Sequence, residues 1–472
     1  MLRFILILFL LSGCSHNPLK PDLKSLYQVT SSKEAIRPVI LIHGILGAKI
    51  RNEKTNKEIW PGSFWKLMFK DYGNLRLKID PKTLRPFNDD EAYKIFDQVA
   101  GQDYYKKIIQ TLREVGDYKK PLYKNGPTGR YRRLYIFTYD WRSDLALVAK
   151  KLDKFFEKVR KEYNNPELKV DVIAHSMGGL LTRYYARYGR KYVLDKKKFE
   201  PTFDGAKKIN KSIFIGTPNS GSVKALQSLI MGYSLGLGKI PAEVMLTFPS
   251  LYQIIPAPQR GWMIDINGNP IQRDLYDIKT WKKYEWLIFN PKIKAKIRKR
   301  FKDEEKFNNY IQILEKFMKK NLKKGYKFHQ SIGQNYQKGP LEYIVFGGSC
   351  HLSPAKCLVE DVSGEKKVRL YPHQIKNPRE NIPYKKLMLD PGDGSVTKTS
   401  LLGRETLDPT LVKVNSYFPL KYSLFLCEKH DQLPGNITFQ DNLLNIILSQ
   451  KTTHERFKKY NKSFYLEDSN RD

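Results

Sequence analysis

Apolar residues along this chain follow two different periods, and the two alternate. Four short runs of branched apolar residues end at glycine or at a polar turn, which is typical of buried strands. The runs lie at 37–44, 134–139, 170–174 and 212–216. Residues 145–163 and 180–188, which follow strands, carry apolar side chains at the spacing of amphipathic helices. Strands that alternate with helices predict an α/β fold, a mostly parallel sheet with helices on both faces.

The alternation breaks off between residues 220 and 340. This stretch shows no clear buried strand, and its second half is very basic with apolar residues at helical spacing, so it predicts a largely helical cap. A strand pattern returns at 341–347 and again just before His430, and 442–448 predicts a closing helix. The expected division is a core segment at 36–219, a cap or lid insertion at 220–340, a second core segment at 341–450 and a polar tail at 451–472.

The first residues have the pattern of an export signal. A positive start is followed by an apolar stretch that is too short to span a bilayer, which needs about 20 residues. The sequence Leu-Ser-Gly-Cys at 11–14 resembles the lipobox of bacterial lipoproteins. The resemblance implies a signal peptide at 1–13, lipid on Cys14 and a polar tether at 14–35. Ser15 in place of aspartate favours the outer membrane of the cell envelope, whereas an ordinary signal with a chance cysteine is the alternative.

The charge of the chain is strongly positive. Its 472 residues carry a formal net charge of +36, with lysine spread along almost the whole length. Such a field attracts anionic partners, although a lysine-rich solvated surface would have the same composition. Because no nucleic-acid-binding motif accompanies the charge, we expect an anionic membrane surface and no nucleic acid as partner.

Two later cysteines flank a loop-like stretch. Cys350 and Cys357 enclose a segment that contains His351 and Pro354, and an oxidising compartment permits disulfides. The spacing of a zinc site is missing. We therefore expect a disulfide between Cys350 and Cys357, and neither a metal nor a cofactor.

One short stretch carries the strongest chemical signal. In "KVDVIAHSMGGL", at 169–180, an apolar strand runs into Ser176 and then into a predicted helix. This is the setting of a nucleophile elbow, whose usual pattern is Gly-x-Ser-x-Gly. Ala174 replaces the first glycine and adds only a methyl group, while Gly178 keeps the other side open. We expect Ser176 to be a nucleophile.

A nucleophilic serine needs a base and an acid that orients the base. In folds with this elbow the acid and then the histidine follow the serine along the chain. His430 follows an apolar strand-like run, so it would lie on a loop at a strand end. The acid is expected in "DPGDGSVT", where the tight Gly-Asp-Gly turn favours Asp393 over Asp390.

The developing negative charge on a carbonyl oxygen must be met by backbone N–H groups. One donor is the residue after the serine, Met177. The other comes from the loop after an early strand, where Ile45 is the candidate, followed by Leu46.

Several segments together resemble the lecithin:cholesterol acyltransferase and lysosomal phospholipase family of α/β-hydrolases. They are "RPVILIHGILGAKI", "YDWR" at 139–142, "AHSMGG" followed by "FIGTPNSGS", and "GDGSV" followed by "KHDQL". The resemblance covers about 37–449 without most of the insertion. It implies an α/β-hydrolase fold with Ser176, Asp393 and His430 as catalytic triad and Ile45 and Met177 as oxyanion hole. The chain departs from the family in Ile-His-Gly at 42–44, in Ala174 and in lacking a lid disulfide.

The resemblance also implies the chemistry. Members of the family act on phospholipids and related acyl esters, and they hydrolyse the ester or pass the acyl chain to an alcohol. The sequence leaves these two outcomes open. Two other interpretations stay open as well: a non-catalytic lipid-binding envelope lipoprotein, and a small-ester hydrolase or peptidase on the same fold.

Overall fold

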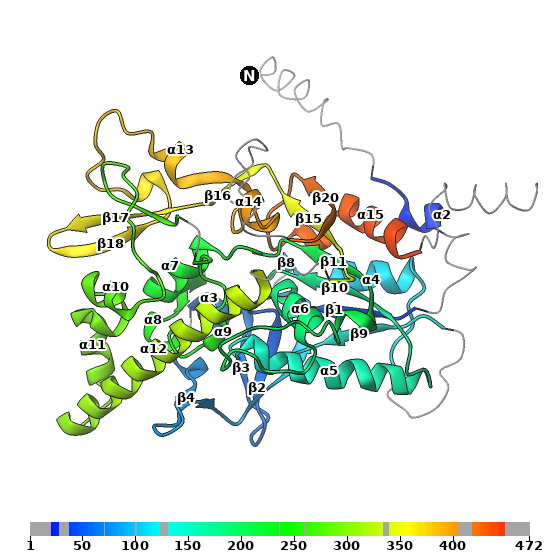
Figure 1. Cartoon of the computed structure of the whole chain (residues 1–472), viewed down its shortest axis with the longest axis horizontal. Helices are drawn as coiled ribbons and strands as arrows, with labels where there is room; N and C mark the ends of the chain where they lie inside the picture. Colours follow the sequence, from blue (N-terminus) through cyan, green and yellow to red (C-terminus); the bar gives the residue numbers. More distant parts are fainter. Residues whose placement is uncertain are drawn as a thin grey trace, which may run out of the picture.

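The fold is built around one sheet of six parallel strands (Figure 1). The computed structural model describes residues 20–27, 37–69, 71–99, 102–122, 131–235, 237–258, 261–333, 339–404 and 418–448. In sheet order the strands are β20 (Leu420–Leu426), β15 (Tyr343–Gly348), β11 (Ile209–Ile215), β10 (Val170–His175), β1 (Val39–Ile42) and β9 (Leu134–Phe137). Each of the six predicted apolar runs overlaps one of these strands, so the α/β prediction is confirmed.

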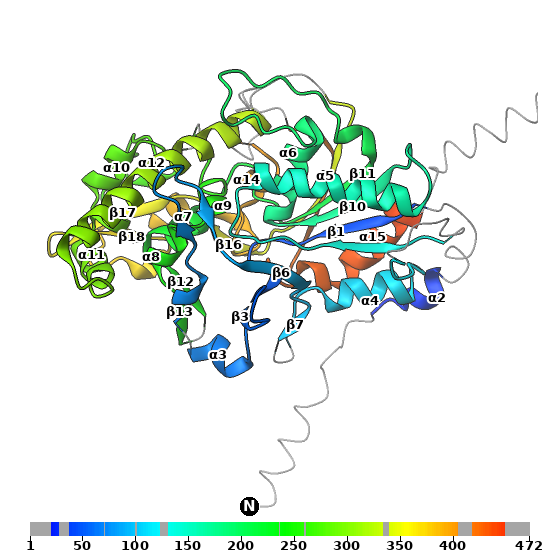
Figure 2. The ribbon, with the colours of Figure 1, turned by 90° about the horizontal axis from the view of Figure 1, so that it is seen from below.

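Helices cover both faces of the sheet. α5 (Leu145–Glu162) and α6 (Met177–Tyr188) pack on one face, and α4 (Lys106–Glu114) and α15 (Ile437–Leu448) pack on the other. Figure 2 shows α4 and α5 on opposite sides of β1 and β10. Side chains of one strand alternate between these two cores: Ile40 and Ile42 face the α5 side, whereas Val39 and Leu41 face the α4 side. This is the α/β-hydrolase architecture.

The predicted helix at 145–163 is confirmed, and its start has a clear cause. The carboxylate of Asp144 accepts a hydrogen bond from the N–H of Ala146 and so caps the first turn of α5. Apolar side chains at helical spacing, among them Leu152 and Phe156, are fully buried against the sheet. The amphipathic pattern therefore fixes both the helix and the face that it buries.

A small antiparallel sheet lies between β1 and β9 in the sequence. It consists of β2 (Ala48–Asn52), β3 (Glu58–Trp60) and β6 (Asp90–Ile95) in the order β3-β2-β6. The guanidinium of Arg142, fully buried, joins this region to the core through ion pairs of 3.1 Å with Asp90 and 2.8 Å with Asp140. The same guanidinium donates to the carbonyl oxygen of Leu75. The "YDWR" tetrapeptide thus includes a central cross-link of the fold.

The 220–340 region is largely helical, with one difference from expectation. Its main helices are α7 (Val223–Met231), α10 (Ile278–Lys283), α11 (Pro291–Arg298) and the 30-residue α12 (Glu304–Gly333). The expectation that it holds no buried strand is wrong at β14 (Met263–Ile264), which is buried and pairs with β17 (Cys357–Val362). A two-residue strand is too short to show an alternating pattern. In the described ranges no helix is long and apolar enough to cross a bilayer.

Candidate active site

Ser176 occupies the sharp turn between β10 and α6. Its backbone has φ 54° and ψ −123°, a conformation that only glycine adopts without strain, and its N–H donates to the carbonyl oxygen of Ile215 at 2.8 Å. A Cβ at Gly178 would lie 2.7 Å from the carbonyl oxygen of His43, so this position must be glycine. Ala174, by contrast, lies within β10 between β1 and β11, where its methyl group is buried. The structure therefore forms the elbow with alanine in place of the first glycine.

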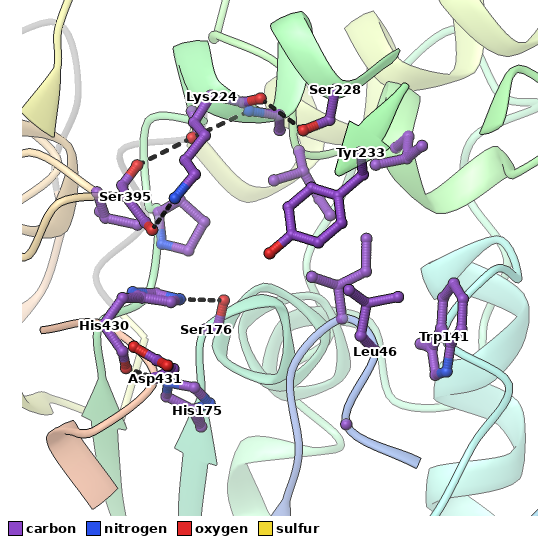
Figure 3. A pocket seen from close by; sticks show the side chains of 18 of the residues that line it. Leu46, Trp141, His175, Ser176, Lys224, Ser228, Tyr233, Ser395, His430 and Asp431 are labelled. Atoms are coloured by element: carbon purple, nitrogen blue, oxygen red, sulfur yellow. Dashed lines mark hydrogen bonds between the residues drawn. The ribbon is translucent and has the colours of Figure 1, made fainter. Parts of the chain in front are cut away.

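His430 lies between Ser176 and Asp393, and Figure 3 shows its ring beside the serine. Its Nε2 is 2.9 Å from Oγ of Ser176, and its Nδ1 is 2.7 Å from Oδ2 of Asp393. The N–H of His430 also donates to the carbonyl oxygen of Asp393, at 3.0 Å. Asp390, the alternative acid, lies in β19 (Leu389–Gly392) opposite Ser353. The three predicted side chains thus form one continuous hydrogen-bonded series.

The environment of Asp393 keeps its carboxylate charged. Burial alone would raise the pKa of Asp393, but the charge of His430 and hydrogen bonds from His430, Val396 and Ser395 together lower it below its ordinary value. The two backbone N–H groups donate to Oδ1 at 2.7 Å and 2.9 Å, which leaves Oδ2 for the histidine. A charged carboxylate in this position orients the ring so that Nε2 faces the serine.

The candidate oxyanion donors lie on either side of Ser176. Met177 is the first residue of α6, and Ile45 is in the loop after β1. Neither of their N–H groups has a hydrogen-bond partner within the described part of the chain. A Cβ at Gly44 would lie 2.7 Å from Cβ of Ser176, so glycine is needed here for the loop to come this close. The α6 N-terminus adds a favourable field for negative charge.

A cavity of about 210 Å³ opens above Ser176 and His430. Most of its wall is apolar and aromatic, and includes Leu46, Trp60, Trp141, Leu235, Met245 and Leu251. These side chains come from the loop after β1, from β3, from "YDWR" and from the 220–340 region. The 220–340 region therefore supplies part of a cavity wall that is largely apolar.

One cation lies in this largely apolar wall. Lys224 belongs to α7, and its Nζ donates to Oγ of Ser395 at 3.0 Å (Figure 3). Burial lowers the pKa of Lys224, while the carboxylates of Asp393 and Asp431 act in the opposite direction. The sequence analysis missed Lys224 because a single lysine among so many has no distinguishing pattern.

The predicted disulfide is wrong. Cys350 is bonded to Cys427, with a Cα–Cα distance of 4.9 Å, and Cys357 is a buried free thiol in β17. Cys350 and Cys427 follow the adjacent strands β15 and β20, in which Gly348 is paired with Leu426. Sheet topology thus brings together two residues that are 77 positions apart. The prediction paired Cys350 with Cys357 because the two are close in the sequence, but that closeness does not decide the pairing. Cys14 lies outside the described residues.

The sequence also matches a known family. The profile described as Lecithin:cholesterol acyltransferase matches residues 71–345, more than half of the chain. This protein belongs to the lecithin:cholesterol acyltransferase family. The match includes Ser176 but ends before Asp393 and His430. The assignment of these two residues to the site therefore rests on their hydrogen-bond distances. The chain is accordingly an α/β-hydrolase of a lipid acyltransferase and lipase-like family. No curated protein sequence matches it.

One solved structure supports the fold of this family member. A chain in the crystal structure of the Tle4–Tli4 complex is similar at 13% identity and a TM-score of 0.51, over 88% of this chain and 98% of that chain. Weaker likenesses include the mature lipase BlEst2 of Bacillus licheniformis, at 10% identity and a TM-score of 0.33, over 88% and 94% of the two chains. EstA from Clostridium botulinum has 13% identity and a TM-score of 0.34, over 89% and 90%.

Proposed function

We propose that this protein is a serine-dependent acyl-ester hydrolase or O-acyltransferase that acts on phospholipids or related acyl lipids. The observation that carries the proposal is the continuous series Ser176–His430–Asp393 at the floor of an apolar cavity. A nucleophile, a base within hydrogen-bond reach and an acid that orients the base are the parts that acyl transfer requires.

The mechanism follows from these positions. Ser176 Oγ attacks the ester carbonyl while Nε2 of His430 takes its proton, and Asp393 stabilises the resulting imidazolium through Nδ1. The N–H groups of Met177 and Ile45 bind the oxyanion. His430 then protonates the departing alcohol or lysolipid. Water or a second alcohol, activated by the same histidine, attacks the acyl group on Ser176 and regenerates the enzyme.

The cavity supports an acyl lipid as substrate. Its apolar wall is suited to a fatty acyl chain, and the ammonium group of Lys224 is suited to a negatively charged group such as a lipid phosphate. A peptide substrate would need more hydrogen-bonding groups along the wall. The same cavity would serve an alcohol acceptor, so both hydrolysis and acyl transfer remain within the proposal.

The surface near the cavity supports action at a lipid membrane. Trp65 and Phe69 on α3 (Phe64–Phe69) are 69% and 54% exposed, and Leu237, in the hairpin of β12 (Tyr233–Leu235) and β13 (Gly238–Ile240), is 81% exposed. α3 contacts this hairpin, and Leu235 of the same hairpin lines the cavity. Exposed aromatic and apolar side chains beside the cavity, on a chain of net charge +36, fit an anionic membrane surface.

We further propose that lipid on Cys14 anchors the protein in the cell envelope, with the outer membrane as its location. The short apolar stretch followed by Leu-Ser-Gly-Cys supports this proposal. Multiple acyl chains on one cysteine would give stable attachment. The residues between Cys14 and α2 (Leu23–Tyr27), a short helix whose Leu23 is buried in the core, would link the anchor to the catalytic core.

One experiment tests the catalytic proposal. The full chain in detergent is incubated with mixed phospholipids, with and without a long-chain alcohol, beside Ser176→Ala, and the products are followed by mass spectrometry. Fatty acid that is released only by the unsubstituted protein supports hydrolysis, and an ester of the added alcohol supports acyl transfer. Equal product from both proteins, or none from either, would overturn the proposal and favour a lipid-binding role.

A further inference from the structure

A second hydrogen-bonded series runs beneath Ser176, separate from the Ser176–His430–Asp393 series. The N–H of Gly44 donates to the hydroxyl oxygen of Tyr105 at 3.0 Å. The Tyr105 hydroxyl lies 2.7 Å from Nδ1 of His175, and Nε2 of His175 lies 3.1 Å from the carbonyl oxygen of His430. The side chains of Tyr105 and His175 are both buried. The series thus begins beside one candidate oxyanion donor, Ile45, and ends on the backbone of the candidate base.

The direction of every hydrogen bond in this series is determined. A carbonyl oxygen can only accept, so Nε2 of His175 must carry a proton towards His430. In the neutral ring Nδ1 is then an acceptor, and the hydroxyl of Tyr105 must donate to it. The oxygen of Tyr105 accepts from Gly44 at the same time. Every donor therefore has an acceptor, and reversing one bond would leave a buried polar group unsatisfied.

The charge state of His175 agrees with this assignment. Burial, reinforced by the nearby ring of His430, lowers the pKa of His175 to about 3, so the ring is neutral at ordinary pH. Burial also raises the pKa of Tyr105, which keeps its hydroxyl proton in place. The rings of Tyr105 and His175 meet edge to face, with centroids 5.6 Å apart. Packing and hydrogen bonding thus hold both side chains in one arrangement.

We propose that Tyr105 and His175 are positioning residues that hold the oxyanion loop and the His430 loop in register with each other. The inference rests on the proposed function of Ser176 and adds two residues to it. The loop after β1 and the loop after β20 come from distant strands of the sheet, and each presents one reacting group to Ser176. His175 directly precedes Ser176, so the hydrogen-bonded series Gly44–Tyr105–His175–His430, called the relay below, fixes both loops relative to the elbow itself.

Loss of the relay should affect the transition state more than substrate binding. Phenylalanine in place of Tyr105 keeps the ring that lines the cavity and removes only the hydroxyl. The oxyanion loop then loses its hydrogen bond at Gly44, and misplacement by about 1 Å can cost about 100-fold in rate. We expect Tyr105→Phe to lower kcat about 10- to 100-fold and to leave KM within about twofold.

The test compares Tyr105→Phe with Tyr188→Phe. Tyr188 is also fully buried and donates its hydroxyl to a backbone carbonyl, that of Ser331 at 2.7 Å, so it controls for the loss of one buried tyrosine hydrogen bond. Two readouts are taken well below the melting temperature of each variant. One is kcat and KM on a short-chain p-nitrophenyl ester, and the other is the rate at which a fluorophosphonate labels Ser176. A selective fall of kcat and of the labelling rate in Tyr105→Phe supports the relay.

A double substitution separates a relay from two independent contacts. Glutamine at position 175 keeps an amide near the position of Nε2, so His175→Gln preserves the donor to His430 and loses the acceptor for Tyr105. If the two residues act together, Tyr105→Phe combined with His175→Gln is about as slow as the slower single variant, whereas independent effects multiply. His175→Gln alone also gives the answer if Tyr105→Phe does not fold, because it should lower kcat with little change in KM.

The outcomes distinguish the two proposals. If the unsubstituted protein neither turns over esters nor is labelled at Ser176, the proposed function fails and the relay with it. If labelling and turnover depend on Ser176 but Tyr105→Phe and His175→Gln match Tyr188→Phe in kcat, the relay proposal alone is overturned. Multiplying effects in the double variant would also overturn it.

Discussion

Nε2 of His430 lies 2.9 Å from Oγ of Ser176, although 254 residues separate the two side chains in the sequence. Ser176 follows β10 and His430 follows β20, and both strands belong to the same parallel sheet, separated by β11 and β15. Parallel strands end at one common edge, so two loops that are far apart in the sequence meet there. The chemistry of the site is therefore a product of sheet topology.

Replacing the serine tests this relationship most directly. Ser176→Ala should lower kcat by a factor on the order of 10⁶, because no nucleophile remains. The melting temperature should change by only a few degrees. Since Ser176 has a positive φ of 54°, Ser176→Gly should be equally inactive but at least as stable as Ser176→Ala. Ester turnover and thermal unfolding are measured on both variants. Residual activity near that of the parent would rule out Ser176 as nucleophile.

Replacing the acid, Asp393, should lower kcat less than replacing the serine does. Asp393→Asn keeps the shape of the side chain but removes the charge that holds the ring of His430 in one tautomer, so kcat should fall about 10⁴-fold. The matched control is Asp390→Asn, three residues earlier in β19, which should retain nearly all activity. Steady-state kinetics on the same ester compare the two. Equal losses in both variants would contradict the assignment of Asp393.

Buried histidines make stability depend on pH. Burial lowers the pKa of His329 from 6.5 to about 4, whereas the unfolded chain keeps the ordinary value. Between these values the unfolded state binds a proton that the folded state does not, so the free energy of unfolding falls as pH decreases from about 6.5 to about 4. The slope is about 1.4 kcal/mol per pH unit for one histidine.

The contribution of His329 can be measured by urea unfolding at pH 7, 6 and 5. In His329→Gln the amide can still donate to the carbonyl oxygen of Ile255, which accepts from Nε2 at 2.9 Å in the parent, but it cannot titrate. The loss of stability from pH 7 to pH 5 should therefore be smaller in this variant. His373→Gln, which changes an exposed histidine, should behave like the parent. An identical pH dependence in all three proteins would refute the prediction.

The disulfide gives a prediction about stability. Because the bond between Cys350 and Cys427 closes a loop of 77 residues, Cys427→Ala should lower the free energy of unfolding by about 2–4 kcal/mol. Cys350→Ala removes the same bond and should lower the free energy of unfolding by a similar amount. Cys357→Ala should leave the bond intact and be sensitive to reducing agent in the same way as the parent. Peptide mapping without reduction, together with urea unfolding, checks both statements. A crosslinked peptide that contains Cys357 would contradict the pairing.

The sequence predicted the main sheet well for a physical reason. Strands buried on both faces are mostly continuous apolar runs, so 39–42 and, despite Asp171, 170–174 were recognisable in the sequence. The small sheet of β2, β3 and β6 was not, because its strands are half exposed and mostly polar, as in Ala48–Asn52. The serine elbow, the Gly-Asp-Gly turn and the loop after a strand-like run pointed to Ser176, Asp393 and His430, whose side chains lie within hydrogen-bond distance of one another in the structure.

Contacts between distant segments could not be predicted from the sequence. The pairing of Cys350 with Cys427 follows from the adjacency of β15 and β20, which no local pattern encodes. The same holds for Lys224, which lines the cavity beside Ser395, 171 residues later in the sequence. It holds too for the hydroxyl of Tyr105, 70 residues from the histidine to which it donates. Neither side chain belongs to a recognisable motif, so its contact could not be predicted from the sequence.

The last prediction concerns attachment to the membrane. If Cys14 carries lipid, the parent should appear in the membrane fraction and remain there after a high-salt wash, because salt screens electrostatic attraction but does not extract acyl chains. Cys14→Ala should be released in soluble form, or by salt if the net charge of +36 holds part of it on anionic lipid. Fractionation with and without salt, followed by mass spectrometry of the N-terminal peptide, distinguishes these cases. Salt-resistant membrane retention of Cys14→Ala would mean that lipid on this cysteine is not the anchor, and would direct attention to the exposed apolar side chains of α3.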